Sequence, residues 1–402
     1  MSVVSWLDNY HSDVNFIVRS FIGTVIRKGG NIKTLKWFNN DKSKELPNIL
    51  RFPGKAFSRV EYLYCGGLST NYGTYQQLLK ACKNITNLEI HSYQKSDERN
   101  LATLIRSQNN LRHIACHSIS GGTWRLTAAL RSQARSLRSV KFVKVNFTDV
   151  SLKGLIGCDN VETLEIFDCS GIDIEKFWEP IIERSEFRLK RLCLVRVSIL
   201  PVAIEKIMVR ANEKLEEVTI DRRVMDEMPY FLEMLSNNCP NISYLKIFLR
   251  DIGEIQLLFS CAITWSKLKT LVIRTSYVNV DEVLPSLAKF VPISLRLLDI
   301  NMKISPKPLE SFLEDCEAPI MKLTLDRDSI TNEHLKVLTK YALEKKSLKS
   351  VVFAHTYGWG GSRISEEVEN RAKEVFELDE STELDDFFFL CADNNDNLSE
   401  WW

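Results

Sequence analysis

The sequence lacks the features of a chain that crosses a membrane or is exported through one. No stretch of its 402 residues approaches the roughly 18–20 uninterrupted apolar residues that a transmembrane helix needs. The segment Met1–Asp8 has no basic region followed by a long apolar one, as a signal peptide would. The ten cysteines include no C-x-x-C pair. We therefore expect reduced thiols, no membrane partner and a cytoplasmic or nuclear protein.

Recognisable catalytic and nucleotide-binding motifs are also missing. No Ser–His–Asp or Cys–His arrangement can be argued from residue spacing. The glycine-rich segment Gly358–Gly361 lacks the Lys-Ser/Thr end of a P-loop, so we interpret it as a flexible exit from the last repeat. The formal net charge is only +1, without the dense basic stripe that nucleic-acid binding requires. The sequence therefore predicts no enzyme, no cofactor and no nucleic-acid partner.

What the chain does contain is a repeat. A six-residue phrase returns thirteen times: an aliphatic residue, two variable residues, an aliphatic residue, one variable residue and another apolar residue. The central residues of these phrases are Leu35, Leu63, Leu88, Ile114, Val140, Leu164, Leu192, Val218, Leu245, Leu271, Leu298, Leu323 and Val351. Their mean spacing is roughly 26 residues, which lies within the range of leucine-rich repeats.

Segments with helical periodicity lie between the phrases. The clearest runs from Ile174 to Ile182, where apolar residues recur at the spacing of one buried helix face. Others are Tyr75–Cys82, Trp124–Ala134, Val202–Ala211, Pro229–Leu235, Ile252–Phe259 and Glu333–Leu343. A strand followed by a crossover helix, repeated, gives parallel strands with right-handed connections. The sequence therefore predicts an α/β fold: a right-handed leucine-rich-repeat solenoid (a horseshoe) of about 13 repeats, with a parallel sheet on its concave face and helices on its convex face.

We expect four parts along the chain. Residues 1–30 form an N-terminal helical cap, built on an amphipathic helix over residues 12–28, and residues 31–357 form the solenoid. Residues 358–378 supply a C-terminal capping helix. Residues 379–402 form a tail with eight acidic residues and no Lys or Arg, which leaves the preceding residues at about +9. We expect this tail to be disordered; because it also carries aromatic residues, docking onto the basic solenoid is the alternative.

Three cysteines mark the same point of the repeat. Cys82, Cys158 and Cys239 each lie three residues before the next phrase, and Cys169 closely follows a strand. A small, readily buried thiol fits close packing at a helix-to-strand turn, so we interpret these residues as structural. With this arrangement, residues 31–354 resemble the cysteine-containing leucine-rich repeats of F-box/LRR proteins, particularly fungal ones.

The resemblance implies a function. F-box/LRR proteins present protein substrates for ubiquitination and dock a Skp-type adaptor through a helical module that precedes the repeats and usually opens with Leu-Pro. Residues 1–30 show no such opening. The resemblance therefore implies the substrate-binding part of a ubiquitin ligase, with a Skp-type adaptor only if an F-box lies upstream. The alternative is a free-standing leucine-rich-repeat interaction protein with no ligase link.

Alternate strand positions in the phrases point out of the concave sheet and form the candidate surface for a protein partner. The residues expected to bind it are Tyr62, Tyr64, His91, His113, His117, Phe167, Arg191, Tyr244, Phe248 and Arg274. Further positions of the same face are Asn87, Glu89, Thr163, Glu165, Lys246, Asp299, Asn301, Lys322 and Asp326. Exposed aromatic residues and Arg are enriched in binding hot spots. The alternative is that some of the aromatic residues only stack on each other along the sheet. We expect the chain to be a monomer.

The histidines raise the question of a metal site. His113 and His117 are four residues apart on a strand, or about 13 Å, so they cannot share an ion. His91 and His117 occupy equivalent positions on neighbouring strands, about 4.8 Å apart, and could share one. The adjacent strands offer Gly66 and Val143 in that row, so no third ligand is apparent. We therefore expect no metal, and keep a partner-facing or pH-sensitive histidine pair as the alternative.

Overall fold

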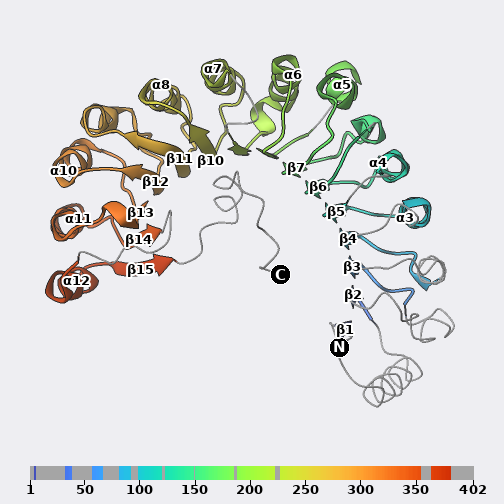
Figure 1. Cartoon of the computed structure of the whole chain (residues 1–402), viewed down its shortest axis with the longest axis horizontal. Coiled ribbons are helices and arrows are strands. Elements are labelled where there is room, and N and C mark those ends of the chain that lie inside the picture. The colour runs from blue at the N-terminus through green and yellow to red at the C-terminus, as the bar shows by residue number, and fades with distance from the viewer. Residues whose placement is uncertain are drawn as a thin grey trace, which may run out of the picture. The chain divides into compact units, whose positions relative to one another are not determined.

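The protein is described by a computed structural model that covers residues 4–5, 32–38, 57–66, 81–91, 98–119, 123–148, 150–184, 188–221, 227–354 and 364–381. It divides into two compact units, Met1–Lys214 and Leu215–Trp402. In each unit the strands are parallel and follow the order of the sequence, and the helices lie along one face of them (Figure 1). No helix in these ranges combines the length and the apolar character that crossing a bilayer demands.

One row of buried apolar side chains, which runs from strand to strand, sets the register of the strands of the first unit. They are β1 (Val4–Ser5), β2 (Thr34–Phe38), β3 (Tyr62–Gly66), β4 (Asn87–His91), β5 (His113–His117), β6 (Ser139–Val143), β7 (Thr163–Phe167) and β8 (Arg191–Val195). Leu63, Leu88 and Ile114 are successive partners across β3, β4 and β5, and each is at most 2% exposed. Burying such a side chain contributes about 1.5–3 kcal/mol. A one-residue slip would turn the whole row outward, so the row fixes the register.

Helical segments of the first unit connect these strands. They are α3 (Glu98–Arg106), α4 (Trp124–Leu130), η3 (Arg131–Gln133), η4 (Leu152–Leu155), α5 (Ile174–Arg184), α6 (Pro201–Ala211) and η5 (Asn212–Lys214). Trp178 of α5 is fully buried, and its Nε1–H donates to the Ser198 carbonyl at 3.0 Å. A Cβ on Gly154 of η4 would lie only 1.6 Å from the Thr127 carbonyl oxygen of α4, so only glycine permits this close packing.

Buried glutamines join consecutive repeats of the first unit. Gln108 Oε1 accepts the Ile85 N–H at 3.0 Å, and Gln133 Oε1 accepts the Leu111 N–H at 3.2 Å. Gln133 Nε2 also donates to the Ile105 carbonyl at 2.9 Å. The two glutamines are 5% and 3% exposed. Their side chains form hydrogen bonds with backbone N–H and carbonyl groups that lie outside the strands. Buried backbone groups of this kind need a hydrogen-bond partner.

Each strand from β5 to β8 is followed by a residue in the left-handed conformation. Ser118, Lys144, Asp168 and Arg196 have φ angles of 52°, 52°, 49° and 54°. None of the four is glycine, which adopts this conformation at the least cost. The N–H groups of Ser118, Lys144 and Asp168 each donate to the carbonyl of the last residue of the next strand, at 2.8–2.9 Å. This hydrogen bond offsets the energetic cost of the left-handed conformation. The same turn therefore recurs at the end of successive strands.

The second unit has the same plan. Its strands are β9 (Glu217–Ile220), β10 (Tyr244–Leu249), β11 (Thr270–Asn279), β12 (Leu297–Lys303), β13 (Lys322–Asp326), β14 (Ser350–Ala354) and β15 (Glu377–Ser381). Its helical segments are α7 (Met228–Asn238), α8 (Ile252–Ala262), α9 (Leu284–Leu287), η6 (Ala288–Phe290), α10 (Pro306–Asp315), η7 (Arg327–Ser329), α11 (Asn332–Lys345) and α12 (Glu366–Lys373).

The predicted leucine-rich-repeat fold is confirmed strand by strand. All thirteen phrases form strands, β2 to β14, and the predicted helix over 174–182 is α5. The expected helix over 124–134 is α4 followed by the tighter turn η3. The helix expected over 12–28 and most of the one over 75–82 lie outside the described residues.

Two strands were not predicted. Val4 of β1 pairs with Leu35, and Leu378 of β15 pairs with Val351, so each continues the row of central residues. The predicted boundary at residue 378, between the capping helix and the acidic tail, therefore falls inside a strand.

Candidate functional site

The candidate site is the face of β3–β8 opposite the helices, which we name the open face (Figure 1). It consists of the first, third and fifth residues of these strands, although in β8 only the first, Arg191, is exposed, because Cys193 and Val195 are buried. In β4, Leu88 and Ile90 are buried, whereas Asn87, Glu89 and His91 are partly exposed. This alternation follows from the two-residue period of a strand. Because neighbouring strands keep one register, the open-face residues lie in rows from strand to strand.

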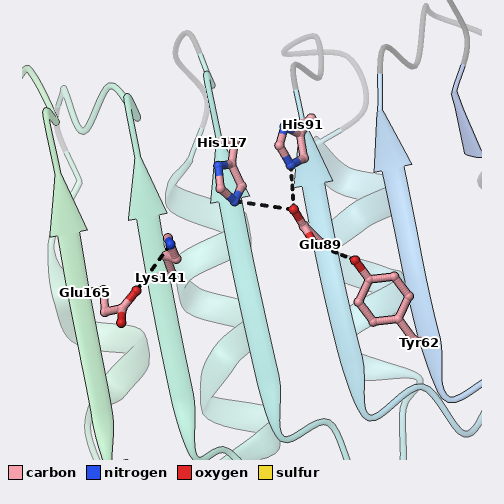
Figure 2. A network of polar contacts seen from close by, with 6 residues as sticks. All are labelled: Tyr62, Glu89, His91, His117, Lys141 and Glu165. Atoms are coloured by element: carbon pink, nitrogen blue, oxygen red, sulfur yellow. Dashed lines mark hydrogen bonds and ion pairs between the residues drawn. The ribbon is translucent and has the colours of Figure 1, made fainter. Parts of the chain in front are cut away.

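Glu89 is the centre of a polar cluster on the open face (Figure 2). Tyr62 Oη donates a hydrogen bond to Glu89 Oε2 at 2.6 Å. The other carboxylate oxygen, Oε1, lies 2.8 Å from His91 Nε2 and 3.7 Å from His117 Nε2. One oxygen is thus held by the tyrosine, while the other faces both histidines. We name Tyr62, Glu89, His91 and His117 the Glu89 cluster.

Protonation within the Glu89 cluster follows from these contacts. The hydrogen bond with His91 lowers the pKa of Glu89 to about 2, against the opposing effect of burial. Burial raises the pKa of Tyr62, and the hydrogen bond to Glu89 raises it further. Burial, together with the nearby charge of His91, lowers the pKa of His117 to about 4. At neutral pH the cluster therefore contains a carboxylate, a protonated phenol and an uncharged His117.

Aromatic rings line up across three strands of the open face. The rings of His91 and His117 stack with centroids 4.0 Å apart and planes inclined by 6°. The ring of Tyr64 meets that of His91 at 4.8 Å and 33°. The rings of Tyr64, His91 and His117 therefore stack along the sheet. The histidine side chains nevertheless stay 28% and 19% exposed, so their outer edges are accessible.

A second group of charges continues the open face across β6, β7 and β8. Lys141 Nζ lies 3.4 Å from Glu165 Oε2, and Arg191 Nε lies 3.6 Å from Glu165 Oε1. Lys141 Nζ also lies 5.2 Å from the centroid of the Phe167 ring, within the range of a cation–π contact. Glu165 is 14% exposed, whereas Lys141 and Arg191 are 38% and 52% exposed. The open face therefore offers basic and aromatic side chains that a shared carboxylate holds in place.

The structure brings some of the predicted contact residues together. The Glu89 cluster contains Tyr62, His91 and His117, and the ring of Tyr64 contacts that of His91. Phe167 and Arg191 belong to the second group. His113 lies exposed at the start of β5. In the second unit, Tyr244 is partly exposed, but Phe248 and Arg274 are only 4% and 5% exposed. Arg274 is held by two contacts to Asp299, at 2.5 and 2.7 Å, so it offers little surface to a partner.

The premise that His91 and His117 lack a third metal donor does not hold. The ligand atoms of Glu89, His91 and His117 all lie within 4.8 Å of one another. Glu89 lies outside the row that contains both histidines, two residues earlier in β4, but its longer side chain reaches that row. A Glu-x-His pair beside a histidine of the next strand is the signal that could have identified it. Lys141, at the corresponding position of β6, was not identified either.

Comparisons with known proteins assign no family to this chain. No family model matches this chain, and none of the curated proteins matches it in sequence. The leucine-rich repeat-containing protein LegL7 from Legionella pneumophila is 10% identical, with a TM-score of 0.37 over 71% of this chain and 90% of that one. A chain in the yeast Rad7 and Elc1 complex is 14% identical, with a TM-score of 0.43 over 92% of this chain and 82% of that one. Both scores lie below 0.5, so the repeat architecture rests on the strands and registers of this chain.

Proposed function

We propose that this chain is a non-enzymatic protein-recognition scaffold and that the open face of its first unit is the binding surface. The observation that carries this proposal is the run of partly exposed aromatic, acidic and basic side chains across β3–β8. Parallel strands of one register hold these side chains at regular spacing. A partner with matching spacing can contact several strands at once.

The chemistry of the open face suits a protein partner. Tyr64 and Phe167 offer aromatic surface, and Arg191 offers a partly exposed guanidinium, which are the side chains enriched in hot spots. Their neighbours Glu89 and Glu165 already hold hydrogen bonds and ion pairs. Immobilising a free side chain costs about 0.5–1.5 kcal/mol on binding, so this pre-ordering favours association.

A finer role follows from the resemblance to F-box/LRR proteins: the partner is a substrate presented for ubiquitination. The free-standing scaffold is the alternative. The two differ in whether a Skp-type adaptor accompanies the native full-length protein. Stoichiometric co-purification of such an adaptor supports the ligase role, whereas its absence from complexes that do contain the open-face partner supports the free-standing role.

Affinity capture with quantitative mass spectrometry tests the binding surface. The double variant Tyr64→Ala with Phe167→Ala truncates two aromatic side chains of the open face. Trp124→Ala is the matched control, because Trp124 is 54% exposed on α4. We expect the partner to bind the double variant at least about tenfold more weakly, since truncating a hot-spot residue costs about 2 kcal/mol or more. The control should bind like the wild type.

Two outcomes would contradict this proposal. One is equal recovery of every captured protein by the wild type and by the double variant, with circular dichroism spectra showing that both are folded. The other is loss of the partner with Trp124→Ala alone, which would place the binding surface on the helices.

A further inference from the structure

Glu89, His91 and His117 bring three donor atoms to one point of the open face. Glu89 Oε1 is 2.8 Å from one Nε2 and 3.7 Å from the other. In tetrahedral coordination with bonds of about 2.0–2.2 Å, two donors of one ion lie about 3.4 Å apart. The two observed separations lie on either side of that value. All three ligand atoms lie within 4.8 Å of one another, so changes of up to about 1.4 Å in their separations would bring them to a common ion.

We propose that Glu89, His91 and His117 form a binding site for a divalent transition-metal ion of the Zn²⁺ class. Two imidazoles and one carboxylate are ligands that zinc, cobalt and nickel accept, whereas magnesium and calcium prefer oxygen donors alone. Three protein ligands leave a fourth position for water, as in open zinc sites. The histidines are 28% and 19% exposed, so an ion can enter from solvent.

The stacked rings define the rearrangement that binding requires. An ion lies near the plane of each imidazole that coordinates it, so the parallel rings of His91 and His117 must turn relative to each other. His91 Nε2 donates to Glu89 in the metal-free cluster. Coordination through Nε2 requires that this nitrogen give up its proton, so the coordinated ring carries a proton on Nδ1 alone.

A residue outside the ligand set supports the carboxylate. Tyr62 Oη holds Glu89 Oε2 at 2.6 Å and leaves Oε1 directed at the histidines (Figure 2). Hydrogen-bonded groups of this type orient metal ligands, and removing them typically costs 10–100-fold in affinity. Lys141 of β6 would repel an incoming cation, and its contact with Glu165 at 3.4 Å reduces that repulsion. The site therefore has an oriented carboxylate and a balanced surrounding charge.

Isothermal titration of the untagged full-length chain with Zn²⁺ tests the site. We expect one saturable ion per chain, with Mg²⁺ and Ca²⁺ giving no comparable binding. Glu89→Gln and His117→Gln should each weaken binding at least about tenfold, and Tyr62→Phe should weaken it by roughly 10–100-fold. His113→Gln is the matched control: it changes an exposed histidine of the same strand as His117 and should bind like the wild type.

Cobalt separates this site from the cysteines. Co²⁺ bound to nitrogen and oxygen donors should give visible bands that disappear in His117→Gln, without the charge-transfer band of a cobalt–thiolate bond. The proposal is overturned if the wild type shows no saturable Zn²⁺ binding, if the charge-transfer band appears, or if His113→Gln weakens binding as much as His117→Gln. Circular dichroism confirms that each variant is folded, and His91→Gln replaces any that is not. The site does not depend on the proposed scaffold role, because it is measured on the isolated chain.

Discussion

His334 joins two neighbouring repeats of the second unit and offers a direct test of how they are held together. It is 2% exposed, and its Nε2 donates to the Ile304 carbonyl at 2.8 Å. Its Nδ1 accepts the backbone N–H of Thr331, the residue that caps α11, at 3.1 Å. One neutral tautomer satisfies both partners, because a carbonyl can only accept and an amide N–H can only donate. Burial lowers the pKa of His334, in agreement with a neutral ring.

The perturbation is His334→Ala. It leaves a buried carbonyl on Ile304 and a capping N–H on Thr331 without their partner, and each such loss costs about 1–3 kcal/mol. The local stability of α11 should therefore fall by at least about 2 kcal/mol, which is roughly a thirtyfold increase in its opening equilibrium. Hydrogen exchange followed by mass spectrometry measures this opening in peptides from Asn332–Lys345. Peptides from α7, in the same unit, serve as the internal control.

The same histidine makes the stability of α11 depend on pH. In the open state the imidazole titrates near about 6.5, whereas in the closed state its pKa is lower. The open state therefore binds more protons than the closed state between these two pKa values. The contribution of His334 to the stability of α11 is complete above about pH 6.5 and is lost as the pH falls below that value. His334→Gln keeps the usual capping-box partner but does not titrate. Relative to this variant, wild-type α11 should be destabilised as the pH falls from about 7.5 to about 5.5. Parallel pH profiles, or unchanged exchange in His334→Ala, would refute the reasoning.

Three further predictions concern buried polar contacts. Glu98, 2% exposed, accepts the Arg125 N–H at 2.6 Å at the start of α4, so Glu98→Ala should cost about 1–2 kcal/mol in urea unfolding and Glu98→Gln less. Asp299→Ala leaves the buried guanidinium of Arg274 without its carboxylate and should cost about 3–5 kcal/mol, seen as a lower unfolding midpoint. Burial raises the pKa of Cys158 to about 12, so mass spectrometry should find its alkylation in the native protein far slower than in urea. Rapid native alkylation would show that this thiol is not held inside the repeat.

The fold could be predicted because the residues that define the repeated phrase are the same residues whose burial stabilises the strands. Leu63, Leu88 and Ile114 define the phrase, and their burial fixes the register of the strands. Strand β15 escaped prediction because Leu378 is its only apolar residue among acidic and polar neighbours. Its strand conformation comes from the backbone ladder with β14, which any side chain permits.

The open face could be predicted only in part. A period of two assigns a residue to a face, but it does not give the reach of a side chain across rows and strands. Glu89 contacts a tyrosine of the preceding strand and a histidine of the following one, and both contacts depend on its length and torsion angles. Likewise, Arg274 and Asp299 were both assigned to the concave face, but the contacts between them, which leave Arg274 only 5% exposed, follow from packing that no spacing encodes.

The left-handed turns after β5 to β8 bear on how such a chain can change its length. Ser118, Lys144, Asp168 and Arg196 share one backbone geometry, although their side chains differ and they lie 26, 24 and 28 residues apart. The exit from the strand is thus constant, and differences in repeat length are absorbed in the segments between a turn and the next strand. A repeat can therefore be duplicated, shortened or removed without redesign of the turn, so the width of the recognition surface can evolve in whole strands while the chemistry of each row changes independently.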